Sequence, residues 1–159
     1  MLRARLWYGP AGHGLALDRV ARYLAGPLAC QVRSETHIRF GRRVQALVLH
    51  DPIAAMIELD RRPEVSAEAA DLIARLPASA PPALALKLAG CTARLDLHDA
   101  PGQRLIPSSG PARSVLVPLA FAMDGLVEDL ESGRLSHFRL PGTPPRNWLA
   151  RILSGLLRR

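Results

Sequence analysis

Apolar and polar side chains alternate along residues 2–8, which is typical of a strand with one face in the core. The two predicted faces are Leu2, Ala4, Leu6 and Tyr8 on the inside, and Arg3, Arg5 and Trp7 on the outside. Glycines and a proline interrupt the chain over 9–14, and the apolar spacing then becomes helical over 15–25. The chain is therefore predicted to begin with a strand followed by a helix.

Alternation returns over 29–40, with Cys30 and Val32 on the inner side, and 44–49 is apolar on both faces like a central strand. Residues 51–57 fit a short helix that begins at Asp51-Pro52, or else a strand over 53–59. The order strand, helix, strand, strand predicts a ferredoxin-like start to an α+β fold.

The rest of the chain predicts a similar mixture of elements. They are helices over 66–76 and from a cap at Ser79 to Ala89, a strand over 92–98, a loop over 100–113, a buried helix over 114–123 with Pro118 confined to its first turn, and a hairpin of strands 126–130 and 135–138. A helix continuing to Glu131 is the alternative to that hairpin.

We therefore predict three segments. Residues 1–138 form one α+β domain with a mixed or antiparallel sheet covered by helices, 139–146 are a Pro/Gly linker, and 147–159 are a basic amphipathic helix. That helix could pack on its own domain, in a partner's groove or on a membrane surface.

Composition agrees with a folded domain, since 48% of the 159 residues are hydrophobic and 22% are charged. The opening residues lack the apolar core of a secretory signal, and the apolar run 114–123 is half of the roughly 20 residues that a membrane span needs. A cytoplasmic protein without a transmembrane segment is predicted. Cys30 and Cys91 have no metal or redox spacing and are predicted to be buried thiols.

The net charge of +7 is distributed unevenly. Residues 1–50, 51–71, 72–138 and 139–159 carry +6, −4, 0 and +5. Basic ends of this kind could attract nucleic acid, an anionic membrane or an acidic protein.

Two predicted strands end in the dipeptide His-Asp, within the segments LVLHDP (47–52) and LDLHDA (95–100). If these strands were adjacent and parallel, His50 and His98 with their aspartates could bind a metal or form an acid/base pair. The alternation instead turns His98 toward water, and Asp51 and Asp99 also suit ordinary turns or caps. No catalytic residue, metal ligand or cofactor is therefore assigned.

No nucleotide-binding, hydrolase or zinc-protease motif occurs. The glycines of GPAGHG (9–14) could hold an anion on backbone amides, although a plain strand-to-helix turn also requires glycines.

The outward residues of the first strands could form one basic sheet face that binds a partner or nucleic-acid phosphates. His37 would lie on this face, and the predicted partner-binding residues are Arg3, Arg5, Trp7, Arg33 and Arg39, with Trp148, Arg151 and Ile152 of the terminal helix. Trp7 is the one stacking aromatic there, which disfavours RNA binding.

In element order, and in segments such as ALKLAGCTARLDL (85–97) and LAFAMDGLVEDLESGRL (119–135), the chain resembles small bacterial α+β proteins of the immunity or toxin-associated type. The resemblance implies stoichiometric occlusion of a partner, such as a toxin or effector, without catalytic residues. We therefore expect a non-catalytic protein-binding domain, an immunity or adaptor protein. The alternatives are nucleic-acid binding through the basic face and a metal-dependent enzyme that uses His50 and His98.

Overall fold

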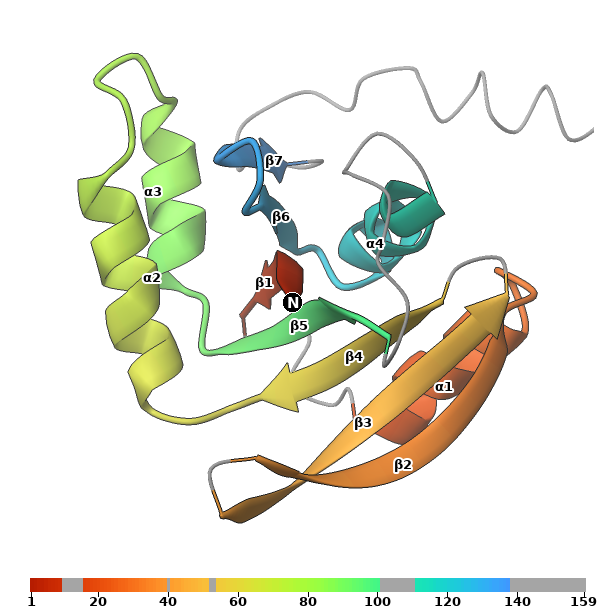
Figure 1. Ribbon diagram of the computed structural model, residues 1–159. Coiled ribbons are helices and arrows are strands. Elements are labelled where there is room, and N and C mark those ends of the chain that lie inside the picture. Colours follow the sequence, from red (N-terminus) through yellow and green to blue (C-terminus); the bar gives the residue numbers. More distant parts are fainter. Residues whose placement is uncertain (10–15, 40, 52–53, 101–110, 138–159) are drawn as a thin grey trace, which may run out of the picture.

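In the computed structural model, the described residues form one antiparallel sheet of seven strands in the order β2-β3-β4-β5-β1-β6-β7 (Figure 1). The structure describes residues 1–9, 16–39, 41–51, 54–100 and 111–137. The strands are β1 (Leu2–Tyr8), β2 (Gln31–Arg39), β3 (Arg42–Asp51), β4 (Ala55–Asp60), β5 (Ala93–Asp99), β6 (Leu126–Asp129) and β7 (Arg134–His137). The helices are α1 (Leu17–Ala25), α2 (Glu64–Ala74), α3 (Pro82–Ala89) and α4 (Pro111–Ala122).

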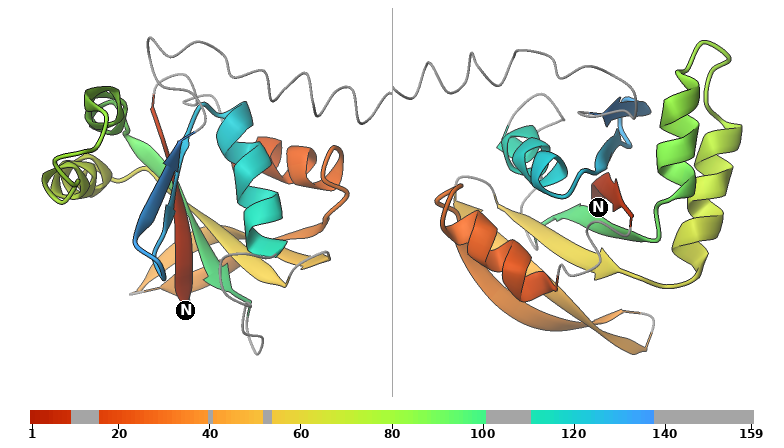
Figure 2. Two further views of the ribbon diagram at one scale, coloured as in Figure 1. Left: turned by 90° about the horizontal axis from the view of Figure 1, so that it is seen from above. Right: turned by 180° about the vertical axis from the view of Figure 1, so that it is seen from behind.

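Helices lie on both faces of the sheet, as the view from above shows (Figure 2). Helices α1 and α4 lie on one side, and the α2–α3 pair lies on the other. Alternation within each strand therefore sends one set of side chains toward α1 and α4 and the other set toward the α2–α3 side.

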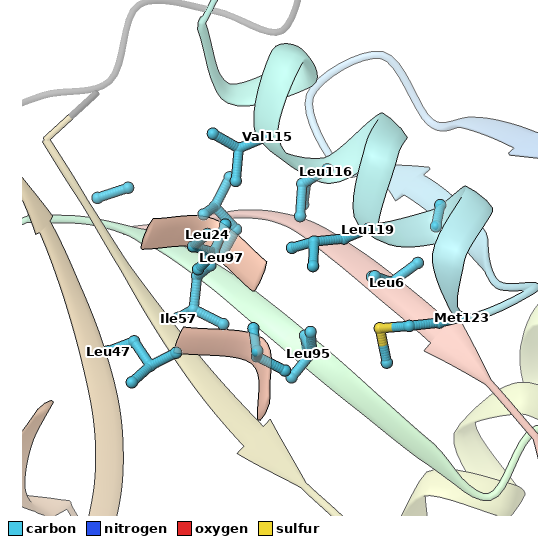
Figure 3. Packing of buried hydrophobic residues seen from close by; sticks show 14 of the residues in the cluster. Leu6, Leu24, Leu47, Ile57, Leu95, Leu97, Val115, Leu116, Leu119 and Met123 are labelled. Carbon is cyan, nitrogen blue, oxygen red and sulfur yellow. The ribbon is translucent and has the colours of Figure 1, made fainter. Parts of the chain in front are cut away.

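The main core lies between the sheet and the α1 and α4 helices (Figure 3). Leu6 of β1, Leu95 of β5 and Ile57 of β4 are completely buried there and meet Leu24 of α1 and Leu119 of α4. A smaller core joins the other face to the α2–α3 pair, and its central side chain is Trp7, which is 1% exposed. Trp7 points away from Leu6 and Tyr8, as the alternation predicts.

Gly125 connects α4 to β6 at a point where the chain passes very close to β1. A Cβ atom at Gly125 would lie 2.6 Å from Leu6 Cδ1 and 2.8 Å from the carbonyl oxygen of Trp7. Only glycine fits this approach of one backbone to another.

The predicted α+β class and the antiparallel sheet are confirmed, but the ferredoxin-like strand order is not. Strand β1 pairs with β5 and β6, and β3 and β4 separate β2 from β5. A ferredoxin-like start would place β1, β2 and β3 next to one another in the sheet. The difference arises because β1 pairs with strands that lie more than 80 residues later in the chain.

Individual elements agree more closely with the sequence. The region after Asp51 continues as the strand alternative, β4, and β6 with β7 forms the predicted hairpin. Two details are wrong: Pro81, rather than Ser79, is the N-cap residue of α3, and α4 begins at Pro111, so Pro118 lies inside the helix. Cys30 and Cys91 are free and buried, as predicted. The predicted linker and terminal helix lie outside the described residues.

Candidate functional site

Charged side chains are concentrated on the α2–α3 side of the sheet, across four neighbouring strands. The antiparallel register places Arg5 of β1 opposite both Asp96 of β5 and Glu128 of β6, and places Asp96 opposite Glu58 of β4. We call the following set the ionic cluster: Arg5, Glu58, Asp60, Glu68, Arg94, Asp96, His98 and Glu128. Glu68 comes from α2, and the cluster therefore joins that helix to the sheet.

Arg94 is the centre of the ionic cluster, with a side chain that is 4% exposed. Its Nη2 atom lies 3.1 Å from Asp60 Oδ2, its Nε atom lies 2.9 Å from Asp96 Oδ1, and it donates to Glu68 from Nη1. Three carboxylates thus surround one buried guanidinium, which compensates part of the cost of removing its charge from water.

Arg5 and Trp7 extend the ionic cluster toward β6. The Arg5 guanidinium lies between 3.6 and 3.8 Å from Glu68, Asp96 and Glu128. The guanidinium carbons of Arg5 and Arg94 lie 5.7 and 5.2 Å from the Trp7 ring centroid, within the range of cation–π contacts. The indole Nε1 of Trp7 donates a 2.9 Å hydrogen bond to Glu128. Trp7 is therefore held by both its ring face and its polar edge.

Burial affects the acids of the ionic cluster in different ways. Burial raises the pKa of Asp96 to about 6, although Arg94 and Arg5 act in the opposite direction. At Asp60, burial also favours the neutral form, but hydrogen bonds from Arg62 and the nearby Arg94 hold the pKa below its ordinary value. The raised pKa allows Asp96 to change protonation near pH 6.

The histidine that was expected to point toward water belongs to the same buried face. His98 is 6% exposed, and its Nε2 atom lies 3.4 Å from Glu58 Oε2. The prediction of a water-facing His98 is therefore wrong, since alternation assigns a face without saying what covers that face.

The proposed meeting of His50 and His98 is also not found. Strand β4 lies between β3 and β5, so the two strands run parallel without being adjacent. His50 is exposed, whereas His98 is buried beside Glu58. Within the part of the chain that the structure describes, no group of three His, Cys, Asp or Glu side chains could hold a metal ion.

The residues predicted to form one basic face are divided between distant parts of the sheet. Arg3, Arg5 and Trp7 lie on β1, whereas Arg33 and the backbone of Arg39 lie on β2, with three strands between. Arg3 binds Asp99 through Nε at 2.8 Å and Nη2 at 3.1 Å, beside the N-terminal amine. The predicted Trp148, Arg151 and Ile152 contacts lie outside the described residues, as does most of the GPAGHG turn.

The carboxylates that neutralise the β1 arginines were not identified from the sequence. A signal existed in β5, where Arg94, Asp96 and His98 occupy alternate positions, as Arg3, Arg5 and Trp7 do in β1. Pairing those two strands would have predicted Arg5 opposite Asp96, but the pairing itself could not be deduced.

Strand β2 forms one edge of the sheet among the described strands (Figure 1). It has nine residues, against four in β7 at the other edge. Arg33, Ser34 and Thr36 are exposed, and Ile38 is 78% exposed. His37 Nε2 lies 3.4 Å from Glu35 Oε2 on the same strand. The outer side of β2 is therefore a candidate protein interface.

A second surface feature lies between α1 and α4. This open hollow has a volume of about 370 Å³ and is mainly apolar. It is lined by Arg19, Arg22, Tyr23, Leu119, Ala122 and Met123.

No protein-family model matches the chain, and the searches of curated proteins and of solved structures also gave no match. Within the described ranges, no helix combines the length and the apolar content needed to cross a membrane.

Proposed function

We propose that this chain is a non-catalytic protein-binding domain that takes an extended segment of its partner as an additional strand against β2. The observation that carries the proposal is the length of this edge: β2 has nine residues and, among the described strands, pairs on one side only, with β3. Addition of a strand to such an edge is a common way for proteins to bind peptides and each other.

Backbone groups supply the affinity in this mode. Every second residue of an edge strand directs its N–H and C=O away from the sheet, where they can pair with an incoming strand. The four-residue β7 offers fewer such groups at the opposite edge. This difference in length favours β2 as the binding edge.

Side chains of β2 supply the selectivity. Arg33 and Glu35 lie on the face that is not covered by α1, with opposite charges two positions apart. Such a pair prefers a partner strand that places an acidic residue opposite Arg33 and a basic residue opposite Glu35. Arg33 is one of the residues that the sequence predicts to contact a partner, and a cytoplasmic immunity or adaptor role remains part of this proposal.

The ionic cluster has a structural role in this proposal. Its charges contact one another and Trp7, and Glu68 attaches α2 to the sheet. Nucleic-acid binding by Arg5 would require this residue to leave Asp96, Glu68 and Glu128, so the protein-binding function is favoured.

The test is co-purification of the tagged chain from its native cells, compared with Arg33→Glu. Arg134→Glu is the matched control, because it makes the same charge change at an exposed strand residue on the opposite edge. We expect a stoichiometric protein complex with the unmodified chain and with Arg134→Glu, and its loss with Arg33→Glu. A complex that survives Arg33→Glu unchanged would contradict binding at β2.

A further inference from the structure

We propose that the strand added to β2 is β2 of a second copy of this chain, in an antiparallel pair centred on Ser34. The inference rests on the proposed function, because it names the partner of the same edge. It predicts a two-fold symmetric dimer in which the sheet continues from one copy into the other.

Symmetry limits the registers that are available. Residues opposite each other in an antiparallel pair point to the same face of the sheet. In β2, Val32 is opposite the core residue Leu49 and lies on the α1 side, whereas Arg33 is opposite Val48 and lies on the other side. A two-fold axis perpendicular to the sheet keeps these faces, so the axis must lie midway between the two copies of one β2 residue.

Charge then distinguishes between the possible centres. An axis at Arg33 would put two arginines opposite each other, and an axis at Glu35 would put two glutamates opposite each other, both of which are unfavourable. An axis at Thr36 would place Arg33 opposite position 39, which is also an arginine. An axis at Ser34 places Arg33 opposite Glu35 twice, and each such pair contributes favourably. An axis at His37 would also pair Glu35 with position 39 twice, but it overlaps only residues 35–39 of β2, whereas an axis at Ser34 overlaps residues 31–37. The charges of β2 therefore fit a second copy of β2 in this register.

The other side chains are compatible with the same register. Val32 lies opposite Thr36 of the partner on the α1 side, which suits a pair of β-branched residues. The paired segment runs from 31 to 37, and Ile38 lies immediately beyond it. Ser34 faces its own copy at the axis.

Charge reversal provides the first test, with mass measured by sedimentation equilibrium from about 1 to 100 μM, a range suited to a small interface. The expected mass of the unmodified chain at the upper end approaches twice the 17.3 kDa of one chain. Arg33→Glu and Glu35→Arg should each be monomeric, because each places two like-charged pairs across the axis. An equimolar mixture of the two variants should form a heterodimer, because both pairs then become attractive.

Cysteine substitution tests the register independently. With the axis at Ser34, the two Cα atoms at position 34 are about 4.5 to 5.5 Å apart, which a disulfide can span. The two residues at position 36 are four positions apart along the strands, roughly 13 Å, which is too far. Mild oxidation should therefore link Ser34→Cys into a covalent dimer and leave the exposed Thr36→Cys unlinked.

The outcomes separate the dimer from the proposed function. An unmodified chain that stays monomeric over the whole range, or a mixture of variants that does not associate, would overturn the second copy as the partner. If Arg33→Glu still abolished a stoichiometric complex with another protein, binding at β2 would stand. Efficient cross-linking of Thr36→Cys with none of Ser34→Cys would overturn the register.

Discussion

Arg94→Met tests whether the ionic cluster contributes to the stability of the fold. The substitution keeps an unbranched apolar stem of similar length and removes the guanidinium, so lost packing is a minor part of its effect. It leaves Asp60, Asp96 and Glu68 without their shared cation in a region where the Arg94 side chain is 4% exposed.

The expected loss follows from the burial of these groups. Removal of one partner from a buried ion pair typically costs about 3 to 5 kcal/mol, since the remaining charge stays buried without compensation. Arg5 still lies 3.6 and 3.7 Å from Glu68 and Asp96, so the lower half of that range applies. We expect the free energy of unfolding to fall by about 3 kcal/mol.

The measurement is urea unfolding followed by far-ultraviolet circular dichroism at pH 7. Arg62→Met is the matched control, because Arg62 also binds Asp60, at 2.7 Å, but its side chain is 54% exposed. That variant should lose less than about 1 kcal/mol. Equal small losses in both variants would refute the argument that burial of the ionic cluster determines its energetic importance.

Two further predictions concern single sites. Because burial raises the pKa of Asp96 from its ordinary 3.8 to about 6, ionisation of Asp96 destabilises the folded state as pH rises from about 4 to 6. Asp96→Asn lacks this cost, so its free energy of unfolding should rise relative to that of the unmodified chain by up to about 3 kcal/mol across that pH range. A difference between the two proteins that does not depend on pH would contradict the raised pKa. Gly125→Ala should lower the free energy of unfolding by about 1 to 3 kcal/mol, because the new methyl group would lie 2.8 Å from the Trp7 carbonyl oxygen. Gly90→Ala is the control, because the atom nearest to its new methyl group would be 3.5 Å away. Equal effects of the two substitutions in urea unfolding would contradict the steric explanation.

Local patterns in the sequence predicted the elements well because their causes are local. Alternation identified β1 and β5 and assigned Leu6 and Leu95 to the core face. Helical spacing bounded by glycine or proline identified α1 and α3 to within a few residues. These features depend on neighbouring side chains, which a single sequence contains.

The charged face could not be predicted, because its character depends on strand order. Arg5 looked like part of an exposed basic surface, yet Glu128, which is 123 positions later, and Glu68 of α2 approach it in the fold. Trp7 looked like an exposed aromatic for the same reason, and the α2–α3 pair covers it. The edge position of β2 likewise depends on the whole sheet order, so the candidate interface follows from topology rather than from a motif.

The ionic cluster also changes how the net charge of +7 should be understood. The cluster contains five acids and two arginines, a formal charge of −3 with neutral histidine, so the other residues together carry +10. Two such copies repel each other at long range, and a symmetric dimer therefore requires local attraction at its axis. Glu35 provides the acidic side chain for that attraction on β2, opposite Arg33 of the other copy. Its reversal to arginine removes the single acid of β2 from the interface and also adds to the general repulsion, so the expected loss of the dimer with Glu35→Arg has two electrostatic causes, whereas that with Arg33→Glu has only the local one.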